Sequence, residues 1–229
     1  MLAGYSPWDS FQEGDIHLWC ADLNHMNHLV DQLEVCECEK ESASQSKESI
    51  HRDRYLLRKG LTRLLISHYT SMKPKEILFK KGTLGKPVFD YPGLCFNVSE
   101  SHGHFVIAFS AKGEIGVDIE PPRKLKGQDR IIRRFFSHEE KLEVKGAEDS
   151  VHGFFQVWTR KEAFIKQKGK SILELNKEEN VIKKYNSDLY YGENGVYIKN
   201  VVTETHIIAV AFEHINQRIT MYNVEQLFI

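Results

Sequence analysis

The sequence predicts an α+β fold built from two similar halves. Each half contains one long segment with the periodicity of an amphipathic helix, followed by short apolar runs with strand character. The run HFVIAFS at 104–110 resembles HIIAVAFE at 206–213, and each lies downstream of a helix with an internal Arg-Lys pair. This repetition indicates two halves, residues 1–112 and 113–229, related by pseudo-two-fold symmetry with a cleft between them.

The first half begins with a strand-like run at 15–20 and a helix-like stretch at 25–36. Residues 34–49 are polar and rich in Ser, Glu and Lys, which indicates a loop or a mobile segment. From Asp53 onward, leucines recur at helical spacing and predict an amphipathic helix. The following segment KGTLGKP, at 81–87, has the composition of a turn.

The strands that come next are predicted from short apolar runs at 94–98 and 105–109. A tight turn at 111–114 leads into a third run at 115–120, so we expect 105–120 to form a hairpin.

The second half continues with a short helix around 131–136 and a second one that Ser137 and Glu140 begin with a capping box. A longer helix is predicted from about Gly153 to Lys168. Four strand-like runs complete the chain, at 189–191, 196–202, 206–212 and 219–222.

The composition restricts the kinds of partner. Thirty-one Lys and Arg face 32 Asp and Glu, so no global charge favours nucleic acid or an anionic membrane. No apolar run reaches the length of a membrane-spanning helix, and the N-terminal residues lack the pattern of a secretory signal. We expect a cytoplasmic monomer that binds neither nucleic acid nor membrane. Four thiols in unpaired spacing are expected to stay reduced, namely Cys20, Cys36, Cys38 and Cys95.

Two acids in the run GVDIE, at 116–120, are candidates for metal binding. Side chains alternate along a strand, so Asp118 and Glu120 share a face about 6 to 7 Å apart, whereas Val117 and Ile119 point into a core. A solvated outer face would screen the repulsion between the two carboxylates. Alternatively, the two acids share a hard cation such as Mg²⁺, which takes oxygen ligands.

A second acidic and basic pair lies on the helix that contains VWTRKEAFIK, at 157–166. Glu162 and Lys166 are one turn apart at the border of the apolar stripe. In one interpretation they form an ordinary ion pair on the helix surface. In the other, Glu162 is a metal ligand or a general base, and Lys166 stabilises a phosphate or a leaving group. Spacing alone leaves both interpretations open.

Taken together, several motifs resemble those of the 4'-phosphopantetheinyl transferase superfamily. GVDIE, followed some forty residues later by WTRKEAFIKQKGKSI, is similar to its two signatures, and RRFFSHEE lies between them. The helix RDRYLLRKGLTRLL, the GKP loop and FNVSES occur in the family's order, so the resemblance covers about residues 50–175. The similarity is greatest to the single-chain, surfactin-synthetase-activating type, in which both halves lie on one chain and the active site is in the cleft between them.

The resemblance implies a metal site and two catalytic residues. Asp118, Glu120 and Glu162 match the family's Mg²⁺ ligands, and three converging carboxylates make physical sense around such a cation. Glu162 would also take the proton from the acceptor serine, and Lys166 would stabilise the departing 3',5'-ADP.

Coenzyme A is the implied co-substrate. Its phosphates would contact Arg54, Lys86 and Pro87 of the GKP loop, Ser99 of FNVSES, and His102, which follows that segment. The sequence departs from the family at Glu100, which stands where a phosphate-binding histidine is usual. Three interpretations are open. The Glu100 carboxylate turns away from the phosphates, His102 takes over the phosphate contact, or the binding of coenzyme A is weakened.

The implied function is Mg²⁺-dependent transfer of 4'-phosphopantetheine from coenzyme A to a serine of an apo acyl or peptidyl carrier protein, for fatty acid, polyketide or nonribosomal peptide biosynthesis. An acidic carrier protein would dock on a basic stretch, or this stretch is simply a solvated face. Its residues are Arg123, Lys124, Lys126, Arg130, Arg133 and Arg134. Glu100 favours an alternative, a non-catalytic module that binds coenzyme A or a carrier protein. A magnesium phosphohydrolase or nuclease would be expected to have a stronger basic groove.

Overall fold

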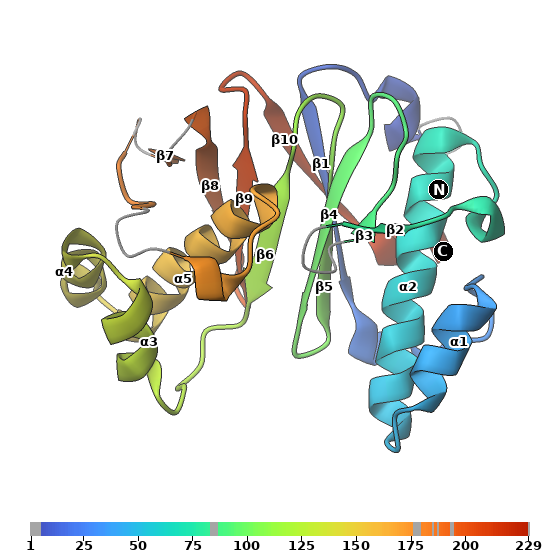
Figure 1. Ribbon diagram of the computed structural model, residues 1–229, viewed down its shortest axis with the longest axis horizontal. Coiled ribbons are helices and arrows are strands. Elements are labelled where there is room, and N and C mark those ends of the chain that lie inside the picture. Colours follow the sequence, from blue (N-terminus) through green and yellow to red (C-terminus); the bar gives the residue numbers. More distant parts are fainter. Residues whose placement is uncertain are drawn as a thin grey trace.

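The computed structural model describes residues 6–82, 87–175, 180–184, 186, 188–192 and 195–228. It has two four-stranded sheets, with strand orders β10-β1-β5-β4 and β6-β9-β8-β7 (Figure 1). The first sheet comprises β1 (Asp15–Asp22), β4 (Cys95–Ser101), β5 (His104–Ser110) and β10 (Arg218–Asn223). The second comprises β6 (Gly116–Glu120), β7 (Leu189–Tyr191), β8 (Tyr197–Val202) and β9 (Ile207–Phe212). The helices are α1 (Glu37–Ser44), α2 (Ser49–Thr70), α3 (Gln128–Phe135), α4 (His138–Gly146) and α5 (Ser150–Gln167).

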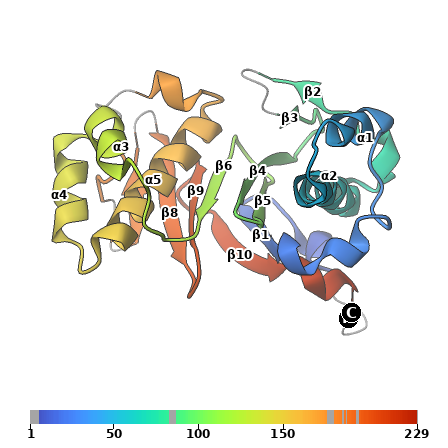
Figure 2. The same ribbon diagram turned by 90° about the horizontal axis from the view of Figure 1, so that it is seen from below.

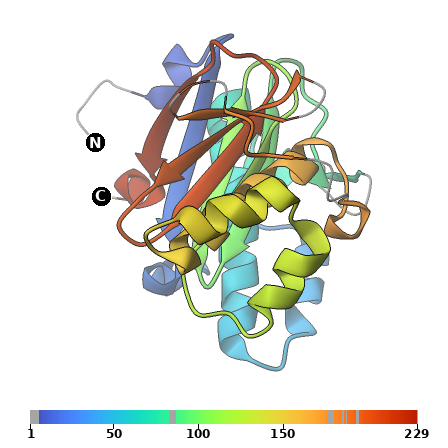
Figure 3. The same cartoon turned by 90° about the vertical axis from the view of Figure 1, so that its left-hand side faces the viewer.

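The core consists of three apolar layers, because each sheet is buried on both faces. Strand alternation sends Trp19 of β1 toward α2 and Leu18 toward the second sheet. Figure 2 shows α2 beside the first sheet and α5 beside the second. The helices α3 and α4 lie outside α5, on the side of the molecule that faces the viewer in Figure 3. The predicted α+β class is confirmed.

Secondary structure with a strong local signal follows the prediction. The long helices α2 and α5 are present, and Asp149 begins α5 by accepting a hydrogen bond from Val151 N at 2.8 Å. Ser137 and Glu140 form the predicted capping box of α4. The strands of the second half also lie where the apolar runs predict them.

The predicted hairpin at 105–120 is wrong. Strand β5 pairs with β1 on one side and β4 on the other, so no free edge remains for β6. Instead, β6 pairs antiparallel with β9 in the second sheet. The chain therefore passes from one sheet to the other at 111–115, and the hairpin in this region is β4–β5.

Segment 34–49 also differs from the prediction, because it contains helix α1. Glu39 of α1 is buried and accepts a hydrogen bond from Arg63 Nε of α2 at 2.8 Å, which attaches the polar segment to the core. Cys36 and Cys38 form a disulfide beside this contact, contrary to the expectation of reduced thiols. The helix-like stretch at 25–36 contains only the short 3-10 turns η2 (Leu23–His25) and η3 (Asn27–Leu29).

The last strand returns to the first sheet. β10 pairs in parallel with β1, and Arg218 Nη2 donates to Asp15 Oδ1 at 2.9 Å where this pairing begins. The division of the chain at residues 112 and 113 stays a prediction. Across the described ranges, none of the helices combines the length and apolarity required to span a bilayer.

Candidate active site

The two sheets meet where β4 and β6 lie side by side (Figures 1 and 2). Alternate residues of β4 bond across this junction. Asn97 Oδ1 accepts from Val117 N at 2.9 Å, and Ser99 Oγ donates to Asp118 Oδ1 at 2.8 Å. Ser101 Oγ lies 2.7 Å from Glu120 Oε2, to which it also donates. Side-chain bonds from one face of β4 thus connect the sheets and reach both predicted acids.

Helix α5 approaches β6 closely because Gly116 has no side chain. A Cβ at this position would lie 2.1 Å from Ala163 O and 2.4 Å from Gln167 N, both in the backbone of α5. This contact places the last two turns of α5, which include Glu162 and Lys166, beside β6.

Asp118 is the most deeply buried of the three predicted metal ligands, with 5% of its surface exposed. Its Oδ1 accepts hydrogen bonds from Ser99 Oγ and from Lys166 Nζ, the latter at 2.7 Å. Its Oδ2 is buried and has no hydrogen-bond partner among the described residues. Burial raises the pKa of Asp118, and the neighbouring Lys166 opposes that rise.

Glu162 is held in a partly protonated state near neutral pH. Burial raises its pKa to about 7, the negative charge of Asp118 adds to the rise, and Lys166 opposes it. Glu120 contributes a further, smaller increase. Because each acid affects the others, the three predicted metal ligands share one electrostatic environment, and Glu162 can exchange a proton near pH 7.

The chemistry of these donors fits a hard cation. They are carboxylates, and the unpaired Asp118 Oδ2 is the kind of buried oxygen that a divalent ion would satisfy. Over the part of the chain that the structure describes, however, no three His, Cys, Asp or Glu side chains form a ready metal site. In this arrangement Lys166 supplies positive charge to Asp118.

Arg54 and His102 lie at one end of the junction, around the β4–β5 turn. Arg54 Nη2 donates to Asn24 Oδ1 at 2.6 Å, and Asn24 packs against Gly103 so closely that a Cβ there would lie 2.5 Å from its Nδ2. His102 occupies this turn with a φ of 55°, and its Nδ1 is 3.0 Å from Ser101 Oγ. The structure therefore brings Arg54, His102 and Ser101 to the same region.

Glu100 stabilises this turn. Its Oε1 accepts a hydrogen bond from Gly103 N at 2.9 Å. Strand alternation places Glu100 on the same face as Phe96, which packs toward α2, whereas Ser99 faces β6. The carboxylate thus turns back onto its own loop, which supports the first of the three interpretations of this departure.

Two predicted contacts for coenzyme A cannot be placed in the same way. Lys86 lies outside the described residues. Pro87 begins the short strand β3 (Pro87–Val88), which pairs with β2 (Lys80–Lys81).

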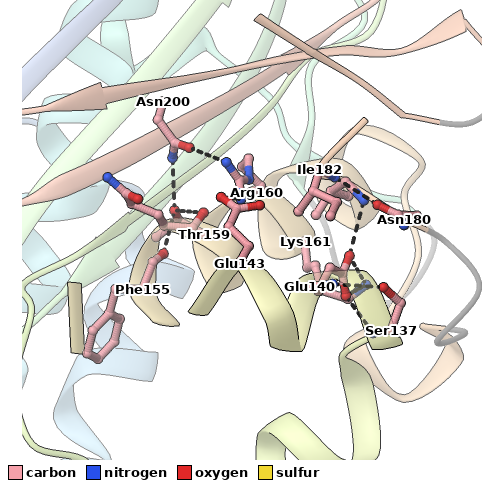
Figure 4. Close-up of polar contacts among 12 residues, drawn as sticks. Ser137, Glu140, Glu143, Phe155, Thr159, Arg160, Lys161, Asn180, Ile182 and Asn200 are labelled. Atoms are coloured by element: carbon pink, nitrogen blue, oxygen red, sulfur yellow. Dashed lines mark hydrogen bonds and ion pairs between the residues drawn. The ribbon is translucent and has the colours of Figure 1, made fainter. Parts of the chain in front are cut away.

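The sequence interpretation assigned no role to Lys161, which the structure places in a buried ion pair. Lys161 Nζ is 2.9 Å from both carboxylate oxygens of Glu140, and both side chains have no exposed surface (Figure 4). This pair fixes α5 against α4 and so orients the turn that carries Glu162. Helical spacing contains the signal, because Lys161 falls between Val157 and Phe164 on the apolar stripe.

The basic stretch after β6 divides into two parts. Arg123 belongs to the site, where its Nη1 donates to Glu120 Oε2 at 2.6 Å. The other basic side chains are exposed, namely Lys124, Lys126, Arg130, Arg133 and Arg134.

Residues 114–205 match the protein family described as "4'-phosphopantetheinyl transferase superfamily". The chain is 28% identical over 173 residues to 4'-phosphopantetheinyl transferase HetI of Nostoc sp., spanning 72% of this chain and 73% of that protein. It is 36% identical over 129 residues to 4'-phosphopantetheinyl transferase Sfp of Bacillus subtilis, spanning 55% of each. With 4'-phosphopantetheinyl transferase AcpT of Escherichia coli, the identity is 35% over 139 residues, 57% of this chain and 65% of that protein. The matches to Sfp and AcpT therefore span less than two thirds of those proteins.

Proposed function

We propose that the chain, which is similar to members of the 4'-phosphopantetheinyl transferase superfamily, transfers 4'-phosphopantetheine from coenzyme A to a serine of an apo carrier protein. The observation that carries this proposal is the position of Glu162, a carboxyl group with a pKa of about 7 that shares its environment with Asp118, Glu120 and Lys166. Such a group can accept a proton from a hydroxyl nucleophile at neutral pH.

In the proposed reaction, the carrier serine Oγ forms a bond to the phosphorus nearer the pantetheine arm. The bond between this phosphorus and the bridging oxygen breaks, and 3',5'-ADP leaves with the electron pair. Glu162 takes the serine proton, directly or through a water molecule. The Nζ of Lys166 lies beside Asp118, in the acid cluster where the reaction would take place. Its positive charge would therefore stabilise the negative charge on the leaving group.

Asp118, Glu120 and Glu162 would hold Mg²⁺ in this proposal. When bound, Mg²⁺ would neutralise charge on the pyrophosphate. The buried and unpaired Asp118 Oδ2 supports this assignment. Lys166 would then have to share Asp118 or release it, which would make its ammonium group available to the substrate.

Coenzyme A would bind at the end of the junction that contains Arg54 and His102, and would extend toward Ser99 beside Asp118. Arg54 supports this placement because its Nε is buried without a hydrogen-bond partner among the described residues, so this guanidinium has an unused donor. Lys86 and Pro87 of the GKP loop would complete the contacts with the phosphates.

The pseudo-two-fold relation of the halves is part of the same proposal. The repeated runs form β5 and β9, each of which is an inner strand of its own sheet. The histidines that begin the two runs meet, with the ring centroids of His104 and His206 3.7 Å apart. Equivalent residues contact one another near a two-fold axis, so this contact supports a duplicated fold with the active site between its halves.

An acidic carrier protein is the proposed partner, because the exposed basic side chains of α3 lie just after the strand that carries Asp118 and Glu120. Assignment to the surfactin-synthetase-activating type is part of the same proposal, and the similarity to Sfp supports it. The monomeric state and the cytoplasmic location stay predictions.

The direct test is to incubate the protein with coenzyme A, Mg²⁺ and several apo carrier proteins and to measure the intact mass of each carrier. We expect the mass of one phosphopantetheine group to be added, and Glu162→Gln to abolish the addition while retaining the fold. No addition with any carrier would contradict the proposal. Binding of coenzyme A without transfer would favour the non-catalytic module that Glu100 suggests.

A further inference from the structure

The two acids of β6 are held in the same way. On each carboxylate, one oxygen accepts a hydrogen bond from a serine of β4 and a second one from a cationic side chain. For Asp118 the oxygen is Oδ1 and the donors are Ser99 and Lys166. For Glu120 the oxygen is Oε2 and the donors are Ser101 and Arg123.

The second oxygen of each acid is left out of these contacts. Asp118 Oδ2 is buried and has no hydrogen-bond partner among the described residues. The bonds from Ser101 and Arg123 both end on Glu120 Oε2, so neither uses Oε1. This arrangement fixes each carboxylate by one oxygen and directs its other oxygen to a ligand.

We propose that Ser101 is a positioning residue that orients the Glu120 carboxylate for a divalent cation. The inference rests on the proposed function, which makes Glu120 a cation ligand. Ser101 acts through Glu120 and does not itself touch the cation or the substrate.

Ser101 is better placed than Arg123 to determine this orientation. Arg123 is only three residues after Glu120, so it moves together with the end of β6. Ser101 belongs to the other sheet, where its register is fixed by pairing with His104 of β5. Its bond to Glu120 therefore attaches the carboxylate to a separate and rigid strand.

The same hydroxyl also connects Glu120 with His102. A serine has one hydrogen to donate, and Ser101 donates it to Glu120 Oε2 at 2.7 Å. The contact of 3.0 Å between Ser101 Oγ and His102 Nδ1 then requires Nδ1 to carry a proton and to donate. Ser101 thereby fixes the ring of His102 and the carboxylate of Glu120 together.

The test measures Mn²⁺ affinity by electron paramagnetic resonance, without coenzyme A, for the full chain and three variants. We expect Ser101→Ala to weaken Mn²⁺ binding about tenfold, because loss of a residue that orients a metal ligand costs roughly 10- to 100-fold in affinity. Ser101→Thr retains the hydroxyl and should restore affinity. Ser110→Ala is the matched control, since Ser110 donates to Lys112 O at the other end of the same sheet.

Transfer kinetics supply the second readout. In Ser101→Ala the KM for Mg²⁺ should rise by about the same factor, whereas kcat at saturating Mg²⁺ should stay within about twofold. A purely structural role would lower the melting temperature and leave the Mn²⁺ affinity unchanged, and that result would overturn the inference. Absence of Mn²⁺ binding in the unmodified protein would overturn it as well. If Mn²⁺ binding depends on Ser101 but no carrier is modified, the positioning role stands and the proposed transfer fails.

Discussion

Lys161 and Glu140 form an ion pair in which neither side chain has any exposed surface. Glu140 also accepts backbone hydrogen bonds from Ser137 N at 2.8 Å and Val181 N at 3.1 Å, so its carboxylate connects α4, α5 and the segment before β7 (Figure 4). Removal of one partner would leave a buried charge without compensation.

We therefore expect Glu140→Ala to lower the free energy of unfolding by about 3 to 5 kcal/mol. The measurement is urea unfolding followed by circular dichroism. Glu139→Ala is the matched control, because Glu139 is the exposed neighbour in the same helix and should change stability little. A double change of Glu140→Leu and Lys161→Met should cost less than Glu140→Ala alone, and equal or greater destabilisation would contradict this account of the pair.

The sequence predicted features that depend on local periodicity, but it did not predict contacts between distant segments such as this ion pair. Apolar periodicity predicted α2, α5 and most strands, because that signal lies within each element. It also predicted that Asp118 and Glu120 share one face of a strand. The partners of these residues could not be predicted, since Ser99 and Ser101 come from another sheet about twenty residues earlier.

The same limitation explains the errors in the first half. Segment 34–49 has too few apolar residues to predict a packed helix, and α1 is instead attached through the buried contact between Glu39 and Arg63, 24 residues apart. The predicted hairpin at 105–120 was compatible with the local pattern. It failed because β5 already has two partners, which only the complete sheet reveals.

Glu162 should reduce stability in the absence of a divalent cation. Its pKa is raised to about 7 in the folded protein, so the unfolded chain loses this proton at lower pH than the folded one. The contribution of protonated Glu162 to the free energy of unfolding is therefore complete below its usual pKa of 4.5 and is lost as the pH rises from 4.5 to about 7. Above that pH, the loss amounts to roughly 2 to 3 kcal/mol.

Glu162→Gln removes this ionisation. In the presence of a chelator, the variant should be more stable than the unmodified protein at pH 8 and should gain little at pH 5. Chemical unfolding at both pH values measures the difference. A gain of equal size at pH 5 and pH 8 would show that ionisation of Glu162 is not its cause.

Gly116 permits the contact between β6 and α5, so Gly116→Ala should disrupt both stability and the site. The added Cβ would meet backbone atoms at 2.1 and 2.4 Å, which cannot move without displacing the helix. We expect a loss of about 1 to 3 kcal/mol and a marked decrease in carrier modification. Gly146→Ala is the control, because a Cβ there has no neighbour within 4 Å. Wild-type melting temperature and activity in Gly116→Ala would rule out the close approach.

The buried His17 should make the protein less stable in acid, independently of the active site. It is buried in the first sheet, and burial lowers its pKa to about 4, although Asp15 partly opposes this effect. Tyr69 explains why the neutral ring is preferred. Its hydroxyl accepts from Trp19 Nε1 at 2.8 Å and lies 2.7 Å from His17 Nδ1, to which it can donate its single hydrogen.

Because the folded pKa lies below the usual 6.5, the unfolded chain binds this proton first as the pH falls. Stability from neutral His17 should therefore be complete above pH 6.5 and should fall by about 3 kcal/mol toward pH 4. Urea unfolding between pH 7.5 and 4 measures this slope, and His17→Asn should reduce it. The exposed His28 provides the control, since His28→Asn should leave the slope unchanged. An identical slope in His17→Asn and the unmodified protein would assign the acid sensitivity to other groups.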